Sequence, residues 1–443
     1  MRTDRTGQDA NHIYPLKFVF TRLTRIPMSI REQIPPTIGK ADAVRALADR
    51  IALKDVAPWG PNVPTHLQAI SSEIGHLNNL DIDLVDAANL PGLSNTLHFA
   101  TADRKLSSPI YLNGRPGCFP EAGADNAFAT TFNVLTVRNG YISHFAGGPF
   151  ILASDGRTII KDYSSRYAGL VHFYSTPMRK CIEDARYIDG LVIPIADDVR
   201  PLNYCHWLVD WLPRLAFIGM QARRRDVYVV TTPLMAQFQR ESLVKCGFDE
   251  SRIIGLTDFE TIRARDLLVP SDFFDFDYHP AHKAAPWAIS YLRSMLGMNS
   301  ILSGKKHDIS VGKKIYISRR DADRRFIVNE NDLIDVLTDF GYTTVTLSDA
   351  PLSEQISIFA NASHIVSLHG AGLANFLFCS HDTSLLEIFP HTYGTPSFYV
   401  IAAGVENTYR TYVANEISAG ERAQADDIFI DLRDFKEKCS PYL

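Results

Sequence analysis

The sequence predicts an α/β protein with two doubly wound domains, and three observations support this fold class. The chain has 443 residues, more than one hydrophobic core normally organises. Short β-branched runs alternate with amphipathic stretches from about residue 191, which is typical of parallel sheets with helical crossovers. A polar break at 299–308 divides this alternation into two series. We therefore expect an N-terminal extension (1–100), an N-terminal α/β domain (101–298) and a C-terminal α/β domain (299–443).

The region before the alternation has two recognisable patterns. Apolar residues at helical spacing predict a helix over 41–53, and nothing else in the first 100 residues carries a chemical motif. Residues 130–162 contain β-rich runs separated by Asn139-Gly140, Gly147-Gly148 and Asp155-Gly156. Asn-Gly and Asp-Gly pairs between apolar runs are strong hairpin signals. We expect an antiparallel β-meander in this segment.

The first series begins with an apolar strand, after which helices and strands alternate. Strands are expected over 191–195, 226–232, 252–256 and 263–274, and helices over 203–222, 234–247 and 280–298. Pro213 lies inside the first of these helices and should interrupt its hydrogen bonding, because proline has no N–H.

The second series shows the same alternation with shorter connections. Strands are expected over 314–319, 342–348, 364–370 and 384–390, and helices over 329–341, 352–362, 371–380 and 397–405. Gly341 stands where a helix C-terminus favours glycine.

Composition excludes several classes of protein. The net charge of -5 argues against nucleic-acid binding, which requires a broad basic surface. The six cysteines form no C-x-x-C pair, so the sequence predicts neither a zinc site nor a dense disulfide framework, and a reducing compartment is favoured. We see no signal peptide and no apolar window of about 18 residues, and we expect a cytoplasmic protein.

Candidate binding residues follow three strands of the second series, at the carboxyl ends where such sheets bind ligands. They are Arg319, Arg320, Arg324 and Arg325, then His369, Gly370, Ala371 and Gly372, and finally Glu387. Arginine forks bind phosphate oxygens, and a glycine turn lets an oxyanion approach backbone N–H groups at a helix start. A carboxylate beside them can accept hydrogen bonds from ribose. The set predicts a nucleotide diphosphate site, whereas the glycines alone are more typical of a turn that permits close packing.

The glycine turn matches neither common nucleotide motif. In "HGAGLAN", Asn375 stands where the third glycine of a dinucleotide fingerprint would be. No GK[ST] follows, so the turn is not a Walker A loop either. An oxidoreductase of the Rossmann type is therefore disfavoured.

The segment "NYCHWLVDWLPRL" carries a second candidate site. His206 and Asp210 are four residues apart, so a helix places them on one face, where the carboxylate can orient the imidazole as a general base. A purely structural pair is an equally good interpretation. Trp207 and Trp211 have the same spacing; core packing is the better interpretation for them, and a sugar-stacking platform is the alternative.

Three D-x-D strings raise the question of a divalent metal. They are Asp81-Ile82-Asp83, Asp275-Phe276-Asp277 and Asp321-Ala322-Asp323. Short acidic strings recur by chance, and the last is surrounded by four arginines that would neutralise it. No metal site is predicted.

Taken together, four stretches resemble one known family. "NYCHWLVDWLPRL", "YISRRDADRRFIVNE", "LSEQISIFANASHIVSLHGAGLANFLF" and "LLEIFP" are similar in order and content to the glycosyltransferase 61 family (the DUF563 domain), in its bacterial polysaccharide-biosynthesis form. The resemblance runs from about 130 to 400. It implies a GT-B fold, with two Rossmann-like domains facing a cleft, and inverting sugar transfer from a nucleotide-sugar donor.

The resemblance also implies roles for individual residues. Arg319, Arg320 and Arg325 would hold the donor diphosphate beside His369, Gly370, Ala371 and Gly372. Glu387 and Asn375 would contact the ribose or nucleoside, and His206 or Asp210 would act as base. Asn203, Tyr204 and Trp207 would face the acceptor.

Further expectations concern ligands and partners. No cofactor beyond a nucleotide-sugar, most often a UDP-sugar, is implied, and the acceptor would be a saccharide or lipid-linked saccharide of a capsule or exopolysaccharide. Peripheral association with the inner face of a membrane and a homodimer are further expectations. The rival interpretation is a non-catalytic nucleotide-sugar or glycan-binding protein that keeps the fold.

Overall fold

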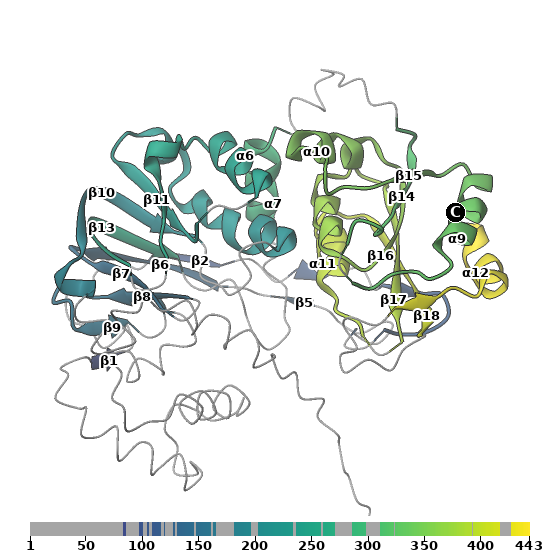
Figure 1. Ribbon diagram of the computed structural model, residues 1–443, viewed down its shortest axis with the longest axis horizontal. Coiled ribbons are helices and arrows are strands. Elements are labelled where there is room, and N and C mark those ends of the chain that lie inside the picture. Colours follow the sequence, from purple (N-terminus) through teal and green to yellow (C-terminus); the bar gives the residue numbers. More distant parts are fainter. Residues whose placement is uncertain are drawn as a thin grey trace, which may run out of the picture.

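The protein has two α/β lobes, seen at the left and right of the computed structural model in Figure 1. The described residues are 83–85, 97–100, 104–105, 109–116, 119, 127–128, 131–145, 148–160, 163–164, 181–195, 203–233, 236–257, 260–270, 286–297, 311–322, 324–391, 393–416 and 427–443. The helix predicted over 41–53 lies outside them. No helix within these ranges is long and apolar enough to cross a membrane.

A ten-stranded mixed sheet forms the N-terminal lobe. Four parallel strands are neighbours in the order β13-β10-β11-β12. The other six strands, β1, β2, β6, β7, β8 and β9, continue the sheet on the far side of β13. The parallel strands are β10 (Arg186–Pro194), β11 (Val227–Thr231), β12 (Ile253–Gly255) and β13 (Thr261–Pro270). The others are β1 (Asp83–Val85), β2 (Leu97–Ala100), β6 (Thr131–Arg138), β7 (Tyr141–Phe145), β8 (Gly148–Leu152) and β9 (Thr158–Ile160). A separate two-stranded sheet pairs β3 (Arg104–Lys105) with β5 (Ala127–Phe128).

The hairpin predicted at Asn139-Gly140 is wrong. Strands β6 and β7 do not fold back on each other; both pair antiparallel with the one long strand β13. Asn139 has a φ of 53°, so Asn139-Gly140 locally interrupts the extended chain that runs along β13. The long β13 offers a continuous ladder, and that non-local pairing overrides the local turn preference. Asp155-Gly156 does turn the chain between β8 and β9, with the Asp155 carboxylate accepting from the Arg157 and Thr158 amides.

The C-terminal lobe has a seven-stranded sheet, in which β15, β14, β16, β17 and β18 are neighbouring parallel strands in that order. The strands are β14 (Lys314–Ile317), β15 (Thr343–Val345), β16 (His364–Leu368), β17 (Ser384–Pro390) and β18 (Thr408–Glu416). The order reverses at β14: the chain steps outward to β15 and then returns to the other side of β14. The sequence did not predict β18, nor its partners β4 (Ile110–Tyr111) and β19 (Ile428–Phe429). The segment with β4 lies in the range assigned to the N-terminal domain, yet it extends the C-terminal sheet.

Helices cover both faces of this sheet. α9 (Glu330–Asp339) and α12 (Leu432–Cys439) lie on its outer face, at the right of Figure 1. α10 (Leu352–Asn361), the 3₁₀ helix η10 (Ala371–Phe378) and α11 (Ser397–Gly404) lie on the inner face. Alternation along the strands explains this: Ile315 and Ile317 join the inner core and Tyr316 joins the outer one.

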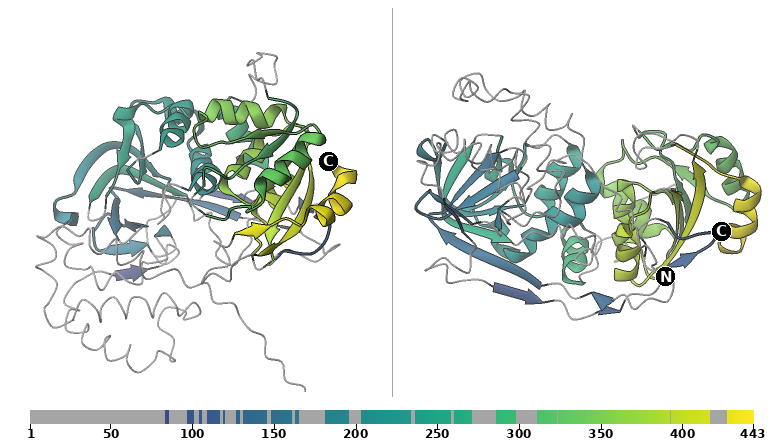
Figure 2. Two further views of the ribbon diagram at one scale, coloured as in Figure 1. Left: turned by 45° about the vertical axis from the view of Figure 1, so that its right-hand side comes forward. Right: turned by 90° about the horizontal axis from the view of Figure 1, so that it is seen from below.

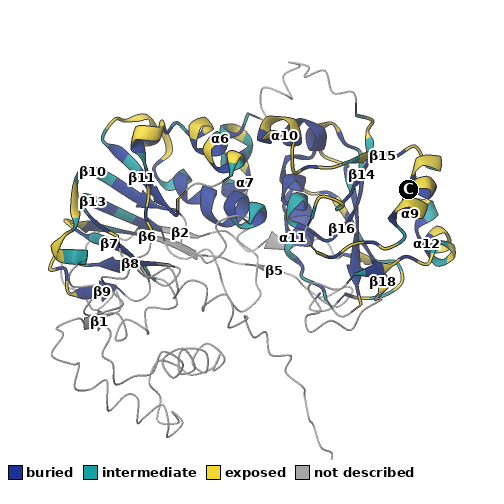
Figure 3. Ribbon diagram, viewed as in Figure 1, coloured by how far each residue is buried: buried dark blue, intermediate teal, exposed yellow. Residues whose placement is uncertain are grey.

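The two lobes meet through their helices. α6 (Gln237–Lys245) and α7 (Pro286–Met295) of the N-terminal lobe face the inner helices of the C-terminal lobe, as Figures 1 and 2 show. Figure 3 colours much of this contact region as buried. One hydrophobic core continues across it, from Trp211 in the first lobe to Leu373 and Phe376 in the second. In the described residues the lobes therefore share a core.

The helix predicted over 203–222 is irregular. A π-helical stretch, η5 (His206–Trp211), is followed by two 3₁₀ stretches, η6 (Leu212–Phe217) and η7 (Gly219–Arg223). Pro213 is the reason, because it cannot donate to the carbonyl of Val209 as an α-helix requires. The predicted interruption at Pro213 is confirmed. The regular helix expected on either side of it is wrong.

Candidate active site

Two loops leave the same edge of the C-terminal sheet side by side. The first is the arginine loop, residues 318–325, which follows β14; the second is the glycine turn, residues 369–372, which follows β16. Ile317 pairs with Ser367 in the parallel register, so both loops begin at the same height. Because the strand order reverses between β14 and β16, the connections that follow them diverge there, and sheets of this kind bind ligands at such a point.

Gly370 leaves room for the guanidinium of Arg319. Its φ of -172° is ordinary extended backbone, so backbone strain does not require glycine here. A Cβ at this position would lie 1.9 Å from Nη1 of Arg319. Arg319 also donates from Nη2 to the Arg324 carbonyl at 3.2 Å, and its buried Nε has no hydrogen-bond partner among the described residues. The arginine therefore lies flat on the glycine turn with one donor unsatisfied.

We predict that Gly370→Ala and Gly372→Ala differ sharply. The first displaces the Arg319 guanidinium, so we expect about a tenfold or greater loss of affinity for UDP, comparable to the loss of one charged hydrogen bond. A Cβ at Gly372 meets only the Cδ1 atom of Leu347, at 2.8 Å, the mobile end of a side chain. Isothermal titration calorimetry measures the UDP affinity of each variant. Equal affinities in the two variants would contradict this role for Gly370.

Arg325 holds the other side of the turn. Its Nη1 donates to the His369 carbonyl at 2.8 Å, and its guanidinium lies 5.3 Å from the ring centre of Tyr393. Its φ of 63° is uncommon for a residue with a side chain and marks a loop held in place by its contacts. Burial, and then the charge of Arg319, lower the pKa of Arg325 to about 10, and burial also lowers the pKa of Arg319. Both remain cationic at neutral pH, so the turn carries two closely spaced positive charges.

His369 and Glu387 form a buried pair behind the turn. Nδ1 of His369 lies 2.5 Å from Oε1 of Glu387, and the Tyr409 hydroxyl donates to Oε2 at 2.5 Å. The ring of His369 stacks on Phe389 with centroids 5.1 Å apart. Burial, then the charges of Arg325 and Arg319, lower the pKa of His369, while burial raises the pKa of Glu387. Both shifts favour the uncharged form of the group.

Glu387, which was expected to contact the ribose, is enclosed by protein groups in the structure. Glu387 is 0% exposed, and both carboxyl oxygens bind protein groups. Tyr409 and Tyr393, which contact this cluster, were not among the predicted residues. Tyr409 lies on the unpredicted strand β18, whereas Tyr393 could have been found because it follows β17 at the same edge of the sheet.

The raised pKa of Glu387 predicts a pH dependence of stability. Above the ordinary pKa of a carboxyl, the unfolded Glu387 loses its proton before the folded one does, so the folded state binds more protons and stability falls as pH rises towards the raised pKa. Glutamine is similar in shape to glutamate but does not titrate. As pH rises, the Glu387→Gln variant should therefore lose less free energy of unfolding than the unaltered protein, with a difference of up to about 1 kcal/mol per pH unit. Urea unfolding of both proteins at pH 7 and 8.5 measures the difference. Parallel profiles would show that Glu387 is ionised in the fold.

Arg320 is engaged by helix α9. Its Nε donates to Glu330 Oε2 at 2.8 Å and its Nη2 donates to Asn331. Glu330 also accepts hydrogen bonds from Tyr316 and Ser318 at 2.7 and 2.8 Å. Of the three arginines expected at the diphosphate, the structure thus brings Arg319 and Arg325 to the glycine turn and pairs Arg320 with α9.

In the N-terminal lobe, His206 and Asp210 are in contact. Nδ1 of His206 lies 2.5 Å from Oδ2 of Asp210 on the π-helical stretch. The carboxylate is fully buried, while the imidazole is 14% exposed. Asn203, expected on the acceptor side, accepts a hydrogen bond from the His206 amide at 3.2 Å. With Nδ1 facing the carboxylate, a role as base would fall to Nε2 of His206. Turns of π-helix are frequent at functional sites.

The two tryptophans belong to the core. Trp207 is 0% exposed and donates from Nε1 to the Ser242 hydroxyl at 2.8 Å. Its ring meets Trp211 edge to face, with centroids 6.0 Å apart. The packing interpretation describes both side chains, and Trp207 presents no surface to an acceptor.

Tyr204 and Asn375 connect the two motifs. The Tyr204 hydroxyl donates to Oδ1 of Asn375 at 2.6 Å, across the lobe boundary. Asn375 is fully buried, and its Nδ2 donates to Gln355 at 2.9 Å and to the Gly372 carbonyl at 3.1 Å. Asn375, expected at the nucleoside, is thus enclosed by protein groups, and Tyr204, expected on the acceptor side, reaches the glycine turn's helix.

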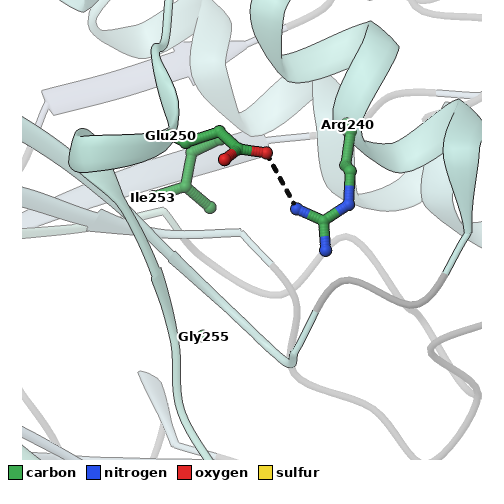
Figure 4. Close-up of a pocket in the computed structure, with 4 residues that line it drawn as sticks. All are labelled: Arg240, Glu250, Ile253 and Gly255. Carbon is green, nitrogen blue, oxygen red and sulfur yellow. Dashed lines mark hydrogen bonds and ion pairs between the residues drawn. The ribbon is translucent and has the colours of Figure 1, made fainter.

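Two other features lie outside this arrangement. Within the described ranges, no three His, Cys, Asp or Glu side chains are placed to hold a metal ion. Four residues of the D-x-D strings lie outside those ranges: Asp81, Asp275, Asp277 and Asp323. Figure 4 shows a pocket on the N-terminal lobe, lined by Arg240, Glu250, Ile253 and Gly255. An ion pair of 3.2 Å between Arg240 and Glu250 crosses it. None of its lining residues belongs to the arginine loop or the glycine turn.

Comparison with known proteins points to one class of enzyme. Residues 204–386 match the model of the family described as Glycosyltransferase 61. The human protein named "Protein O-linked-mannose beta-1,4-N-acetylglucosaminyltransferase 2" is 31% identical over 86 residues, which are 19% of this chain and 15% of that protein. The mouse protein of the same name is 36% identical over 70 residues, 15% of this chain and 12% of that protein. The chain thus covers only a small part of these relatives. Both comparisons support the resemblance to glycosyltransferase 61 and a glycosyltransferase enzyme.

Proposed function

We propose that the protein is a glycosyltransferase that binds the diphosphate of a nucleotide-sugar between its arginine loop and its glycine turn. One observation carries the proposal: Arg319 packs against Gly370 and Arg325 donates to the His369 carbonyl, so both guanidinium groups meet the glycine turn at the carboxyl ends of β14 and β16. Two guanidinium groups at one turn favour a multiply charged anion, because phosphate oxygens offset the repulsion between the two cations and accept their hydrogen bonds. The family match over 204–386 supports the same reading.

In this proposal the arginines make the direct contacts and the buried groups support them. Arg319 offers its unsatisfied Nε and its terminal nitrogens to the diphosphate, and the backbone from Gly370 to Gly372 completes the cradle. His369 and Glu387 hold the turn from behind and keep the His369 carbonyl in place for Arg325. Because Glu387 and Asn375 are enclosed, we assign them to positioning rather than to direct ribose contact.

The chemistry proposed for the N-terminal lobe is base catalysis. Nε2 of His206, oriented by Asp210, takes the proton of an acceptor hydroxyl, and the oxygen attacks the anomeric carbon of the sugar. The bond from that carbon to the diphosphate breaks, and the electron pair leaves with the diphosphate. Arg319 and Arg325 stabilise the charge that develops on it, as oxyanion-binding groups do. A single displacement of this kind inverts the anomeric configuration.

Finer parts of the proposal follow from the resemblance. We propose a GT-B arrangement of the two lobes, transfer without an essential metal, and a UDP-sugar donor. The acceptor would be a saccharide or lipid-linked saccharide in capsule or exopolysaccharide synthesis at the cytoplasmic face of a membrane. The relatives named above are N-acetylglucosaminyltransferases, which makes UDP-N-acetylglucosamine the first donor to test.

A panel of nucleotides tests the proposed function. Thermal unfolding is measured with UDP-, GDP- and CMP-sugars and with NAD and NADP, because a ligand of the folded state raises its apparent stability. We expect one class of nucleotide-sugar to raise the unfolding midpoint, and release of free nucleotide when an acceptor is added. Binding without turnover would favour the non-catalytic binding protein. Stabilisation by NAD or NADP alone would favour an oxidoreductase.

A further inference from the structure

One hydrogen-bonded chain links the segment of the proposed base to the turn of the proposed donor site. It runs from the Tyr204 hydroxyl to Oδ1 of Asn375 at 2.6 Å, and from Nδ2 of Asn375 to the Gly372 carbonyl at 3.1 Å. Tyr204 is two residues before His206, and Gly372 is two residues after Gly370, against which Arg319 lies. The two ends of the chain are therefore adjacent to the two halves of the proposed reaction.

The members of this chain are held tightly from both sides. The ring of Tyr204 packs edge to face on Phe238, with centroids 5.0 Å apart. Burial raises the pKa of Tyr204, so its hydroxyl keeps the proton it donates. Asn375 also donates to Gln355, whose own Nε2 donates to the Leu347 and Ala350 carbonyls. A buried amide with every bond satisfied has one orientation, because any rotation would leave polar atoms unpaired.

Two other hydrogen-bonded contacts between the lobes lie away from the turn. Glu241 on α6 accepts from the Leu352 amide at the start of α10, at 2.9 Å. Arg293 on α7 donates to the Leu377 and Cys379 carbonyls at 2.6 and 2.8 Å, at the far end of η10. These bonds and the shared core also connect the lobes. The Tyr204 bond differs in that it ends on a side chain that bonds the glycine turn itself.

We propose that Tyr204 and Asn375 are positioning residues that set the glycine turn, and with it Arg319, relative to His206. The inference rests on the proposed transferase function. Neither residue needs to touch substrate: Asn375 fixes the Gly372 carbonyl, and Tyr204 ties that geometry to the start of the His206 stretch. Loss of the link would let the turn and the base segment shift independently. A misplacement of about 1 Å between reacting groups can cost about a hundredfold in rate.

The test compares two variants that each remove one hydrogen bond between the lobes. Tyr204→Phe removes the hydroxyl but keeps the ring on Phe238, and Glu241→Ala removes the cap on α10. Hydrogen–deuterium exchange is measured on peptides covering 369–378, and steady-state transfer is measured against the concentration of the donor found by the nucleotide panel. Thermal unfolding midpoints are measured for both variants, to compare the stability that each loses.

In Tyr204→Phe we expect faster exchange in the glycine turn and a kcat lowered about 10- to 100-fold, with donor KM within about threefold of the unaltered protein. In Glu241→Ala we expect a similar loss of stability, with turn exchange and kcat unchanged. Unchanged turn exchange in Tyr204→Phe, or an equal fall of kcat in both variants, would overturn the proposal. If the unaltered protein neither binds nor transfers any nucleotide-sugar, the proposed function fails instead, and the exchange comparison still decides whether the turn is coupled to Tyr204.

Discussion

Arg319→Ala is expected to lower kcat/KM for the donor by about 10²- to 10³-fold, the usual cost of removing one donor from a site that stabilises developing negative charge. Arg319 lies on the glycine turn with its buried Nε unsatisfied among the described residues, so a phosphate oxygen would complete its hydrogen bonding. Arg319→Lys keeps the charge but loses the planar fork, so we expect an intermediate effect. Titration with UDP measures nucleotide binding, and steady-state kinetics measure the transfer reaction.

Arg320→Ala is the matched control for this prediction. Arg320 is the next residue in the same loop, but its guanidinium binds Glu330 and Asn331 of α9. Its side chain is half exposed, so solvent screens the ion pair and we expect a stability loss of only about 0.5–1 kcal/mol. UDP affinity should stay close to that of the unaltered protein. If Arg320→Ala weakened UDP binding and Arg319→Ala did not, the assignment of the two arginines would be reversed.

His206→Gln is expected to lower kcat by about 10²- to 10⁴-fold while leaving UDP affinity unchanged, because general base catalysis contributes in that range. The reason for the separation is spatial: His206 lies on the π-helical stretch of the N-terminal lobe, and the donor loops belong to the C-terminal sheet. Asp210→Asn should give a smaller loss in the same parameter, because Asp210 acts by orienting the imidazole through Nδ1. Single-turnover transfer with saturating donor measures the chemical step.

His364→Gln is the control for the histidine substitution. His364 is the first residue of β16, at the amino end of the strand, opposite the edge from which the glycine turn leaves. We expect kcat to be unchanged in this variant. Normal transfer by His206→Gln at saturating donor would remove His206 from the mechanism and leave the donor site untouched.

The sequence by itself determined the order and type of most elements in the C-terminal lobe. Apolar runs of strand length and amphipathic stretches alternate there with short connections, and the structure has β14 to β17 and α9 to α11 in that order. It also determined that Arg319, Arg325 and Gly370 follow strands rather than precede them. These properties are local, because they depend on side-chain periodicity and on residues close together in the chain.

Only the tertiary structure decided which of those residues meet. The pairing of β14 with β16 brings the arginine loop to the glycine turn, and strand order cannot be read from periodicity. The direction of each side chain separates Arg319 from its neighbour Arg320, and encloses Glu387 behind the turn. The same holds for Asn139-Gly140, where pairing with β13 overrides a local hairpin signal. Gly370 shows the difference most clearly: its sequence context marks a turn, but the need for glycine comes from an arginine 51 positions earlier that lies where a Cβ would be.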